Sequence, residues 1–272
     1  MKHAKKPPLD PAQLRAYIFT VPKAGTYLMD AFLSQLGLNS TGWHVSLNNY
    51  LDTGKHDATT NKTTPSATSV ARNYLQTFRQ VPAGSHAIGH FNPLFVPPAV
   101  LNANQYHIVA VRRHPREVLV SEFIDFRHRR SDVRFVSEQT VPDHGEAFEV
   151  YMREHAPVIR SICLNYLLLQ ENCRSLLYRQ VMGRDPAIFI DFKQFIDDKR
   201  GPEIAQRIAG FLHRSLTPEE VQQRWRAALD ADNKTKSDDV KLPYARDTLW
   251  TPKAMQRYQD LGFPEIESHL GY

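Results

Sequence analysis

An apolar strand that runs through a turn of lysine, glycine and threonine into an amphipathic helix most strongly constrains how this chain folds. The strand pattern covers residues 17–21 and the turn covers residues 22–26. The apolar residues that follow repeat on one helical face, and Gly37 offers a stop: Leu28, Met29, Phe32, Leu33 and Leu36. A strand joined directly to a helix is typical of α/β proteins. The sequence therefore predicts an α/β fold with a central parallel β-sheet flanked by helices.

The turn has the chemistry of an anion-binding site. Exposed backbone N–H groups, the partial positive charge of a helix start and the ammonium of Lys23 all attract a phosphate placed there. Nucleoside triphosphatases use the form G-x-x-x-x-G-K-[ST], with lysine after the second glycine. Here Lys23 precedes Gly25, Thr20 stands at the place of the first glycine, and Thr26 follows Gly25. The loop predicts a phosphate-like ligand, but it is not a standard ATPase or GTPase loop.

A second apolar strand, residues 106–111, ends in cations and passes into a helix that Pro115 suits as a first residue. A guanidinium at the C-terminal edge of a parallel sheet can bind phosphate oxygens with two hydrogen bonds. Adjacent strand residues point to opposite faces, so at most one of Arg112 and Arg113 is expected to enter the site.

A third short strand leads into His90, between the two phosphate motifs. The unperturbed pKa of histidine, about 6.5, suits it to take a proton at working pH. The chain has 12 histidines, and His86 and His44 remain alternative bases beside His90.

Together these motifs resemble the sulfotransferases that use 3′-phosphoadenosine 5′-phosphosulfate (PAPS), whose architecture is similar to that of P-loop nucleoside triphosphatases. The stretch from Pro22 to Leu28 is similar to their P-K-[SA]-G-T-x-[WL] loop. Arg113, Glu117 and Ser121 fall at the spacing of their R-[DN]-x-x-[DE]-x-x-x-S motif. His90 resembles the histidine that follows a strand in these enzymes.

The resemblance implies a role for each of these residues. Arg113 and Ser121 would hold the 3′-phosphate of PAPS, and His90 would take the proton from the acceptor hydroxyl. Lys23 would stabilise the leaving phosphate, and Ser121 would hold Lys23 away from the donor until the acceptor binds. The residues that would bind the 5′-phosphosulfate are Lys23, Ala24, Gly25, Thr26, Tyr27 and Leu28.

Two places depart from the family pattern. Several members have a tryptophan where this chain has Leu28, so the adenine contacts are left unassigned. A later basic loop, often R-K-G in the family, lacks arginine and glycine here and reads Lys234, Thr235, Lys236 and Ser237. Two alternatives are held as equal: this loop contacts the 3′-phosphate, or it is a mobile polar loop without that contact.

Length and composition agree with one domain. The chain has 272 residues, of which 42% are hydrophobic, enough for one large α/β core, so we expect a single sulfotransferase domain over residues 1–272. Residues 1–14 are expected to be flexible. Residues 51–69 are polar without apolar periodicity, which predicts a mobile loop. Residues 51–69, as a lid at the acceptor pocket, and residues 126–145 are the two candidates for acceptor contacts.

The later part of the chain predicts further helices and one strand. Residues 151–178 have a long helical pattern, residues 187–192 form a buried strand pattern, and residues 202–212 have helical periodicity. Residues 217–220 predict a capping box with proline at the first helical position, and Thr251 is the expected cap of a last helix.

The net charge and the cysteine content limit the kinds of ligand and partner that we expect this protein to bind. The net charge of +5 is explained by an anionic nucleotide, and no nucleic-acid-binding motif accompanies it. Cys163 and Cys173 lack the spacing of a metal site, so no metal is expected. The beginning of the chain has no apolar stretch, which predicts no membrane span and a cytoplasmic enzyme.

The expected function is transfer of a sulfuryl group from PAPS to a hydroxyl of a sugar, lipid, peptide or small metabolite, with release of adenosine 3′,5′-bisphosphate. In-line transfer leaves charge on the departing phosphate, as in phosphoryl transfer. Two alternatives remain open, a nucleotide-dependent kinase on a related scaffold and a non-catalytic basic binding module. The sequence does not indicate the acceptor or the oligomeric state.

Overall fold

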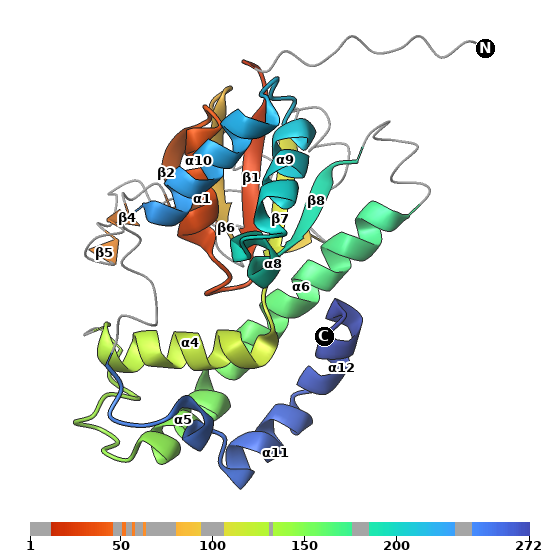
Figure 1. Ribbon diagram of the computed structural model, residues 1–272. Coiled ribbons are helices and arrows are strands. Elements are labelled where there is room, and N and C mark those ends of the chain that lie inside the picture. Colours follow the sequence, from red (N-terminus) through yellow and green to blue (C-terminus); the bar gives the residue numbers. More distant parts are fainter. Residues whose placement is uncertain are drawn as a thin grey trace.

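A central sheet with helices packed around it forms the body of the protein (Figure 1). The computed structural model describes residues 12–45, 51–52, 56–57, 62–63, 80–93, 106–130, 133–175, 185–231 and 241–272. The strands are β1 (Arg15–Thr20), β2 (Asn39–Val45), β3 (Leu51–Asp52), β4 (His56–Asp57), β5 (Lys62–Thr63), β6 (Ser85–Gly89), β7 (Tyr106–Arg112) and β8 (Ala187–Asp191). The helices before β8 are α1 (Thr26–Gln35), α4 (Pro115–His128), α5 (His144–Glu154) and α6 (Ala156–Arg174). Those after it are α8 (Phe192–Ile196), α9 (Gly201–Phe211), α10 (Pro218–Asp230), the 3₁₀ turn η3 (Arg246–Leu249), α11 (Pro252–Asp260) and α12 (Phe263–Leu270).

The strand order in the main sheet is β3-β2-β6-β1-β7-β8. Strands β2, β6, β1, β7 and β8 pair in parallel, which confirms the predicted α/β fold, and β3 adds an antiparallel edge to β2. Strand β1 lies in the middle, and from Ala16 to Thr20 it is fully buried, as expected for a parallel strand covered on both faces.

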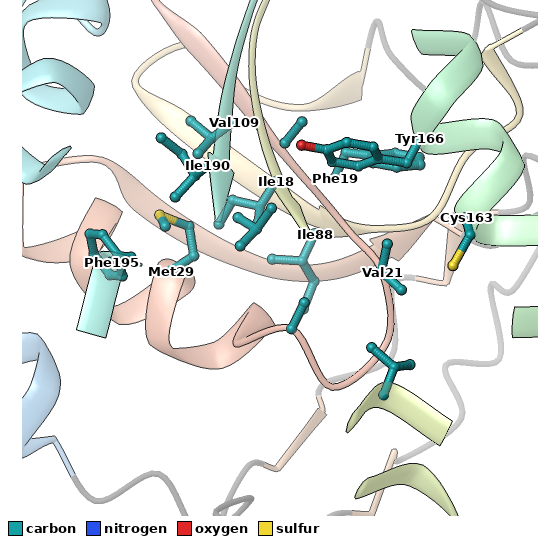
Figure 2. Packing of buried hydrophobic residues seen from close by; sticks show 14 of the residues in the cluster. Ile18, Phe19, Val21, Met29, Ile88, Val109, Cys163, Tyr166, Ile190 and Phe195 are labelled. Atoms are coloured by element: carbon teal, nitrogen blue, oxygen red, sulfur yellow. The ribbon is translucent and has the colours of Figure 1, made fainter. Parts of the chain in front are cut away.

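Alternate residues of β1 enter the two halves of the core. Figure 2 shows Ile18 on the side of Met29 from α1, whereas Phe19 lies beside Tyr166 from α6. The rings of Phe19 and Tyr166 are 6.2 Å apart between centroids. Helix α6 therefore packs on the face of the sheet opposite α1.

The strand register brings the C-terminal ends of neighbouring strands to one edge. Phe19 of β1 pairs with Gly89 of β6, Thr20 of β1 pairs with Val111 of β7, and Arg112 of β7 pairs with Asp191 of β8. The chain segments that leave these strands carry the lysine loop, His90, Arg113 and the start of α8. Parallel α/β sheets bind their ligands at this edge.

The helix starts predicted from proline and capping residues are confirmed. Pro115 lies in the first turn of α4, and Thr251 caps α11. In α10, Thr217 and Glu220 form a complete capping box, with both side-chain-to-backbone hydrogen bonds present. These local signals are strong because the capping side chains satisfy backbone N–H groups that the helix itself leaves without acceptors, and proline in the first turn has no N–H that needs one.

Two of the expected regions contain more than one element in the structure. The helical pattern of residues 151–178 is not one helix, because α5 ends at Glu154 and α6 starts at Ala156 with Pro157 in its first turn, where the missing N–H costs nothing. The segment 51–69, predicted as a mobile loop, contains the two-residue strands β3, β4 and β5, and its mobility stays a prediction. Its other residues, like residues 1–11, lie outside the described part, so the single domain over 1–272 stays a prediction.

Candidate active site

The lysine loop that follows β1 is held in an unusual backbone conformation. Lys23 and Gly25 both adopt the left-handed region, with φ of 57° and 83°, and the Ala24 N–H donates to the Val21 carbonyl at 3.1 Å. A Cβ on Gly25 would lie 2.5 Å from the ring of Phe192, so a side chain at this position would collide with the start of α8. Position 25 therefore requires glycine for two reasons: its backbone is left-handed, and Phe192 occupies the space of a side chain.

The same loop presents the start of α1 to the sheet edge. Gly25 precedes the helix and supplies no side-chain cap, and the helix's own hydrogen bonding begins when the Met29 N–H donates to the Gly25 carbonyl. The amides of the first turn are thus directed outward, as in an anion-binding helix start. The Thr26 and Thr20 hydroxyls lie 2.7 Å apart and fix the loop to the end of β1.

Arg113 connects the second motif to this loop. Its Nη1 donates to the Lys23 carbonyl at 2.9 Å, and its Nε donates to the Glu117 carboxylate at 3.0 Å. The guanidinium also lies 5.2 Å from the ring centre of Phe192. Arg113, which the sequence assigns to the 3′-phosphate, therefore also supports the backbone of the lysine loop, which is assigned to the 5′-phosphosulfate.

Arg112 and Arg113 diverge, as the alternation of a strand predicts. Arg112 lies 3.6 Å from the Asp191 carboxylate and donates to the Leu270 carbonyl, so it joins β7 to β8 and to the end of α12. The ring of Tyr272 lies 5.2 Å from its guanidinium. Of the two arginines, Arg113 is the one that enters the candidate site.

One face of α4 presents three polar residues at intervals of four, namely Glu117, Ser121 and Asp125. Glu117 pairs with Arg113, and Asp125 lies 3.3 Å from the Lys23 ammonium. Ser121, which is buried, lies between them on the same row. The geometry thus gathers Lys23, Arg113 and Ser121 around one helix face.

Burial and charge act in opposite directions on two of these groups. Burial lowers the pKa of the Lys23 ammonium below its ordinary value, and Asp125 opposes that shift. For Glu117, burial raises the pKa, but hydrogen bonds from Lys193 and Arg113 outweigh it and leave the pKa below its ordinary value. Burial therefore has the larger effect on the pKa of Lys23, whereas the neighbouring cations have the larger effect on the pKa of Glu117.

His90 lies at the end of β6, where strands β6 and β2 come unusually close. A Cβ on Gly89 would lie 2.2 Å from the Val45 carbonyl oxygen, and the His90 N–H donates to that oxygen at 2.7 Å. The His90 Nδ1 contacts the Thr20 carbonyl. A carbonyl can only accept, so Nδ1 carries the proton and Nε2 keeps its lone pair. This is the tautomer that a general base requires.

Burial and the neighbouring His44 lower the pKa of His90 to about 3, although the hydrogen bond to Thr20 acts in the other direction. The two histidine rings lie 5.3 Å apart, edge to face. His90 is therefore neutral at working pH, and in this structure it is a weaker base than the unperturbed histidine assumed from the sequence. His86, the other alternative, is fully buried, and its Nε2 lies 2.7 Å from Asp30, so it does not face the site.

Two residues of this arrangement are not among the site residues predicted from the sequence. Asp125 gave a signal only as the third member of the row that Glu117 and Ser121 begin, and Phe192 was read only as the end of a strand. Residues 234–237, assigned to the 3′-phosphate, lie outside the described residues. Part of the predicted acceptor region lines a cavity of about 320 Å³, formed by Arg127, Glu138, Pro142, His144, Pro243 and Tyr244.

Comparison with solved structures identifies the fold. A mouse sulfotransferase, SULT7A1, complexed with PAP, has a TM-score of 0.55 and 12% identity, with 92% of this chain and 83% of that chain covered. A retinol dehydratase in complex with androsterone and PAP has a TM-score of 0.55 and 11% identity, covering 97% and 82%. The sheet and the helices around it thus have the architecture of sulfotransferases.

The sequence itself settles the family. The sulfotransferase domain matches residues 15–244, which include the lysine loop, His90, Arg113 and Ser121. The chain belongs to the sulfotransferase family. A search of curated proteins found no significant match.

Two further features concern metals and membranes. Across the described ranges, no cluster of three or more His, Cys, Asp or Glu side chains is arranged to hold a metal ion. Within the same ranges, none of the helices combines the length and the apolar character that crossing a bilayer demands.

The protonation of His90 predicts how stability depends on pH. An unfolded histidine binds a proton near pH 6.5, but folded His90 does so only near pH 3, so stability conferred by neutral His90 is lost as pH falls below 6.5. Relative to His90→Asn, the wild-type free energy of unfolding should decrease between about pH 6 and 4, with a slope approaching about 1.4 kcal/mol per pH unit. Urea denaturation at a series of pH values measures this, and parallel curves for the two proteins would contradict it.

Proposed function

We propose that the protein is a PAPS-dependent O-sulfotransferase, which moves a sulfuryl group to an acceptor hydroxyl and releases adenosine 3′,5′-bisphosphate. The observation that carries this proposal is the hydrogen bond from Arg113 to the Lys23 carbonyl, 2.9 Å long. This hydrogen bond places the lysine loop, which suits the 5′-phosphosulfate, and Arg113, which suits the 3′-phosphate, in one site. Membership of the sulfotransferase family supports the same reading.

The residues present fit a nucleotide with phosphates at two positions. Gly25 leaves the loop open because it has no side chain, and the first turn of α1 directs backbone amides toward the same place. Lys23 supplies a cation at that end, and Arg113 supplies a second one beside Ser121. Both structural neighbours described above contain PAP, the form that PAPS takes after losing its sulfuryl group.

Lys23 and the loop amides stabilise the charge that transfer creates. PAPS supplies a sulfuryl group that passes in line between two oxygens, with negative charge building on the departing phosphate. The Lys23 ammonium donates to the leaving oxygen, and the N–H groups of Gly25, Thr26 and Tyr27 add fixed dipoles that need no reorganisation. Arg113 and Ser121 hold the 3′-phosphate and so fix the donor's position.

His90 acts as the general base. Its Nδ1 is held by the Thr20 carbonyl, which leaves Nε2 to accept the proton of the attacking hydroxyl. Because Thr20 also contacts Thr26 through its hydroxyl, the base and the donor loop are positioned by one residue. The acceptor carries a hydroxyl; retinol dehydratase, a structural neighbour, has been crystallised with androsterone and with retinol.

Ligand-dependent thermal stability tests the proposed donor. Adenosine 3′,5′-bisphosphate should raise the unfolding temperature far more than AMP, ATP with magnesium, or GTP with magnesium. At 100 times its Kd, a ligand that binds only the folded state stabilises it by about 2.7 kcal/mol. Stabilisation by ATP with magnesium and not by the bisphosphate would favour a kinase and refute the proposal. No stabilisation by any nucleotide would favour a non-catalytic module.

The two adjacent arginines provide a matched pair of variants. Arg113→Ala should weaken binding of adenosine 3′,5′-bisphosphate by about 10- to 100-fold, because it removes charge-assisted hydrogen bonds to phosphate. Arg112→Ala should instead lower the unfolding temperature, since Arg112 ties β7 to Asp191 and Leu270. Isothermal titration calorimetry and thermal unfolding separate the two effects. Equal losses of affinity in both variants would show that Arg113 has no special place in the donor site.

Turnover tests the catalytic assignments. With labelled PAPS and an acceptor that the wild type sulfates, His90→Ala should lower kcat by about 10²- to 10⁴-fold, the usual contribution of a general base. Lys23→Ala should abolish measurable transfer. His86→Ala serves as the comparison, because His86 is paired with Asp30 away from the site. Near-normal turnover of a folded His90→Ala protein would refute the base assignment.

A further inference from the structure

A buried ion pair joins the lysine loop to the interior of α4. The Lys23 Nζ lies 3.3 Å from the Asp125 carboxylate, and the two side chains are only 15% and 9% exposed. The family pattern that the sequence matches ends at Ser121, one helical turn earlier, and gives Asp125 no role. Within the part of the chain that the structure describes, this carboxylate nevertheless forms an ion pair with the lysine.

An ammonium group this deeply buried needs a compensating charge. Removing it from water disfavours the charged form, and a carboxylate within about 4–6 Å restores it. Among the described residues, the charges that act on Lys23 come from α4 and the residue that caps its end: Asp125 and the weaker Glu122 favour the charged form of Lys23, and the cap residue Arg129 opposes it. Arg129 also lies 3.9 Å from the same Asp125 carboxylate, so one acidic group serves two cations.

The geometry of the pair also directs the lysine side chain. The loop is fixed at its backbone, because the Lys23 carbonyl accepts from Arg113, which is in turn held by Glu117 at the start of α4. The side chain extends from that anchor to Asp125, two helical turns along the same face. Backbone and ammonium are thus held by the two ends of one row on α4, with Ser121 between them.

We propose that Asp125 is a positioning residue for Lys23, holding its ammonium in the charged form and in a fixed place beside Ser121. The catalytic consequence rests on the proposed function, in which Lys23 neutralises the leaving phosphate. A neutral amine cannot supply that charge. Asp125 therefore allows Lys23 to stay charged, and so to stabilise the leaving phosphate, up to a higher pH.

The direct test measures the protonation of Lys23 without any reaction of the enzyme. Only the neutral amine reacts with acetic anhydride, so the pH dependence of acetylation at Lys23, read by mass spectrometry, reports its pKa. Lys253, whose side chain is 85% exposed, provides an internal reference. In Asp125→Asn the acetylation curve of Lys23 should move by about 1–3 pH units to lower pH. A curve that coincides with that of the wild type would overturn the proposal.

Three further variants separate charge from structure. Asp125→Glu keeps the carboxylate and should retain a curve near that of the wild type. Glu122→Gln, a carboxylate-to-amide change on the same helix, should shift the curve less than Asp125→Asn does. Asp125→Ser removes the carboxylate with a smaller side chain and replaces Asp125→Asn if thermal unfolding shows that the latter does not fold. A shift in Glu122→Gln as large as that at Asp125 would refute the assignment.

Kinetics then connect the pair to turnover. In the wild type, kcat should fall at alkaline pH as Lys23 loses its proton. In Asp125→Asn this fall should begin at lower pH, and the difference from the wild type should equal the shift of the acetylation curve. At pH values below the fall, KM for PAPS should stay within a few-fold of the wild type. Asp125→Glu should restore the wild-type profile. If the wild type transfers no sulfuryl group, the proposed function fails, but the acetylation curves still decide whether Asp125 controls Lys23.

Discussion

The hydrogen bonding of β1 to both β6 and β7 is the constraint on which the rest of the site depends. It places the ends of three strands side by side, although their residues are far apart in the sequence. Thr20, the last residue of β1, then receives a contact from each side: its carbonyl accepts from His90, and its hydroxyl meets Thr26. A displacement of β1 by one residue would therefore separate the base from the donor loop.

Signals that act within a few residues of the chain were sufficient to predict much of this structure. The lysine loop, the helix start at Pro115 and the capping box at Thr217 all follow from local backbone chemistry, and the predicted order of strands and helices holds. The break at His155 was missed because the apolar pattern continues through it. A pattern of apolar residues predicts which face of a helix is buried, but it does not indicate where the backbone hydrogen bonding of that helix ends.

Features that depend on contacts between distant segments could not be read from the sequence. Asp125 is an ordinary helical carboxylate until the fold brings Lys23 to it, and Phe192 is an ordinary apolar residue until it meets Gly25. The tautomer of His90 likewise depends on Thr20, 70 residues away in the chain. The sequence supplied the reactive groups, whereas the groups that set their charge and direction came from tertiary packing.

The ring of Phe192 connects three segments that belong to different motifs. It fills the space where Gly25 would carry a side chain, it lies against the guanidinium of Arg113, and it begins the helix that follows β8. Positions 25 and 192 are thus under a joint volume constraint. Because the left-handed backbone at position 25 also favours glycine, the constraint acts mainly in one direction: among related sequences, an aromatic residue at position 192 should occur only where position 25 is glycine.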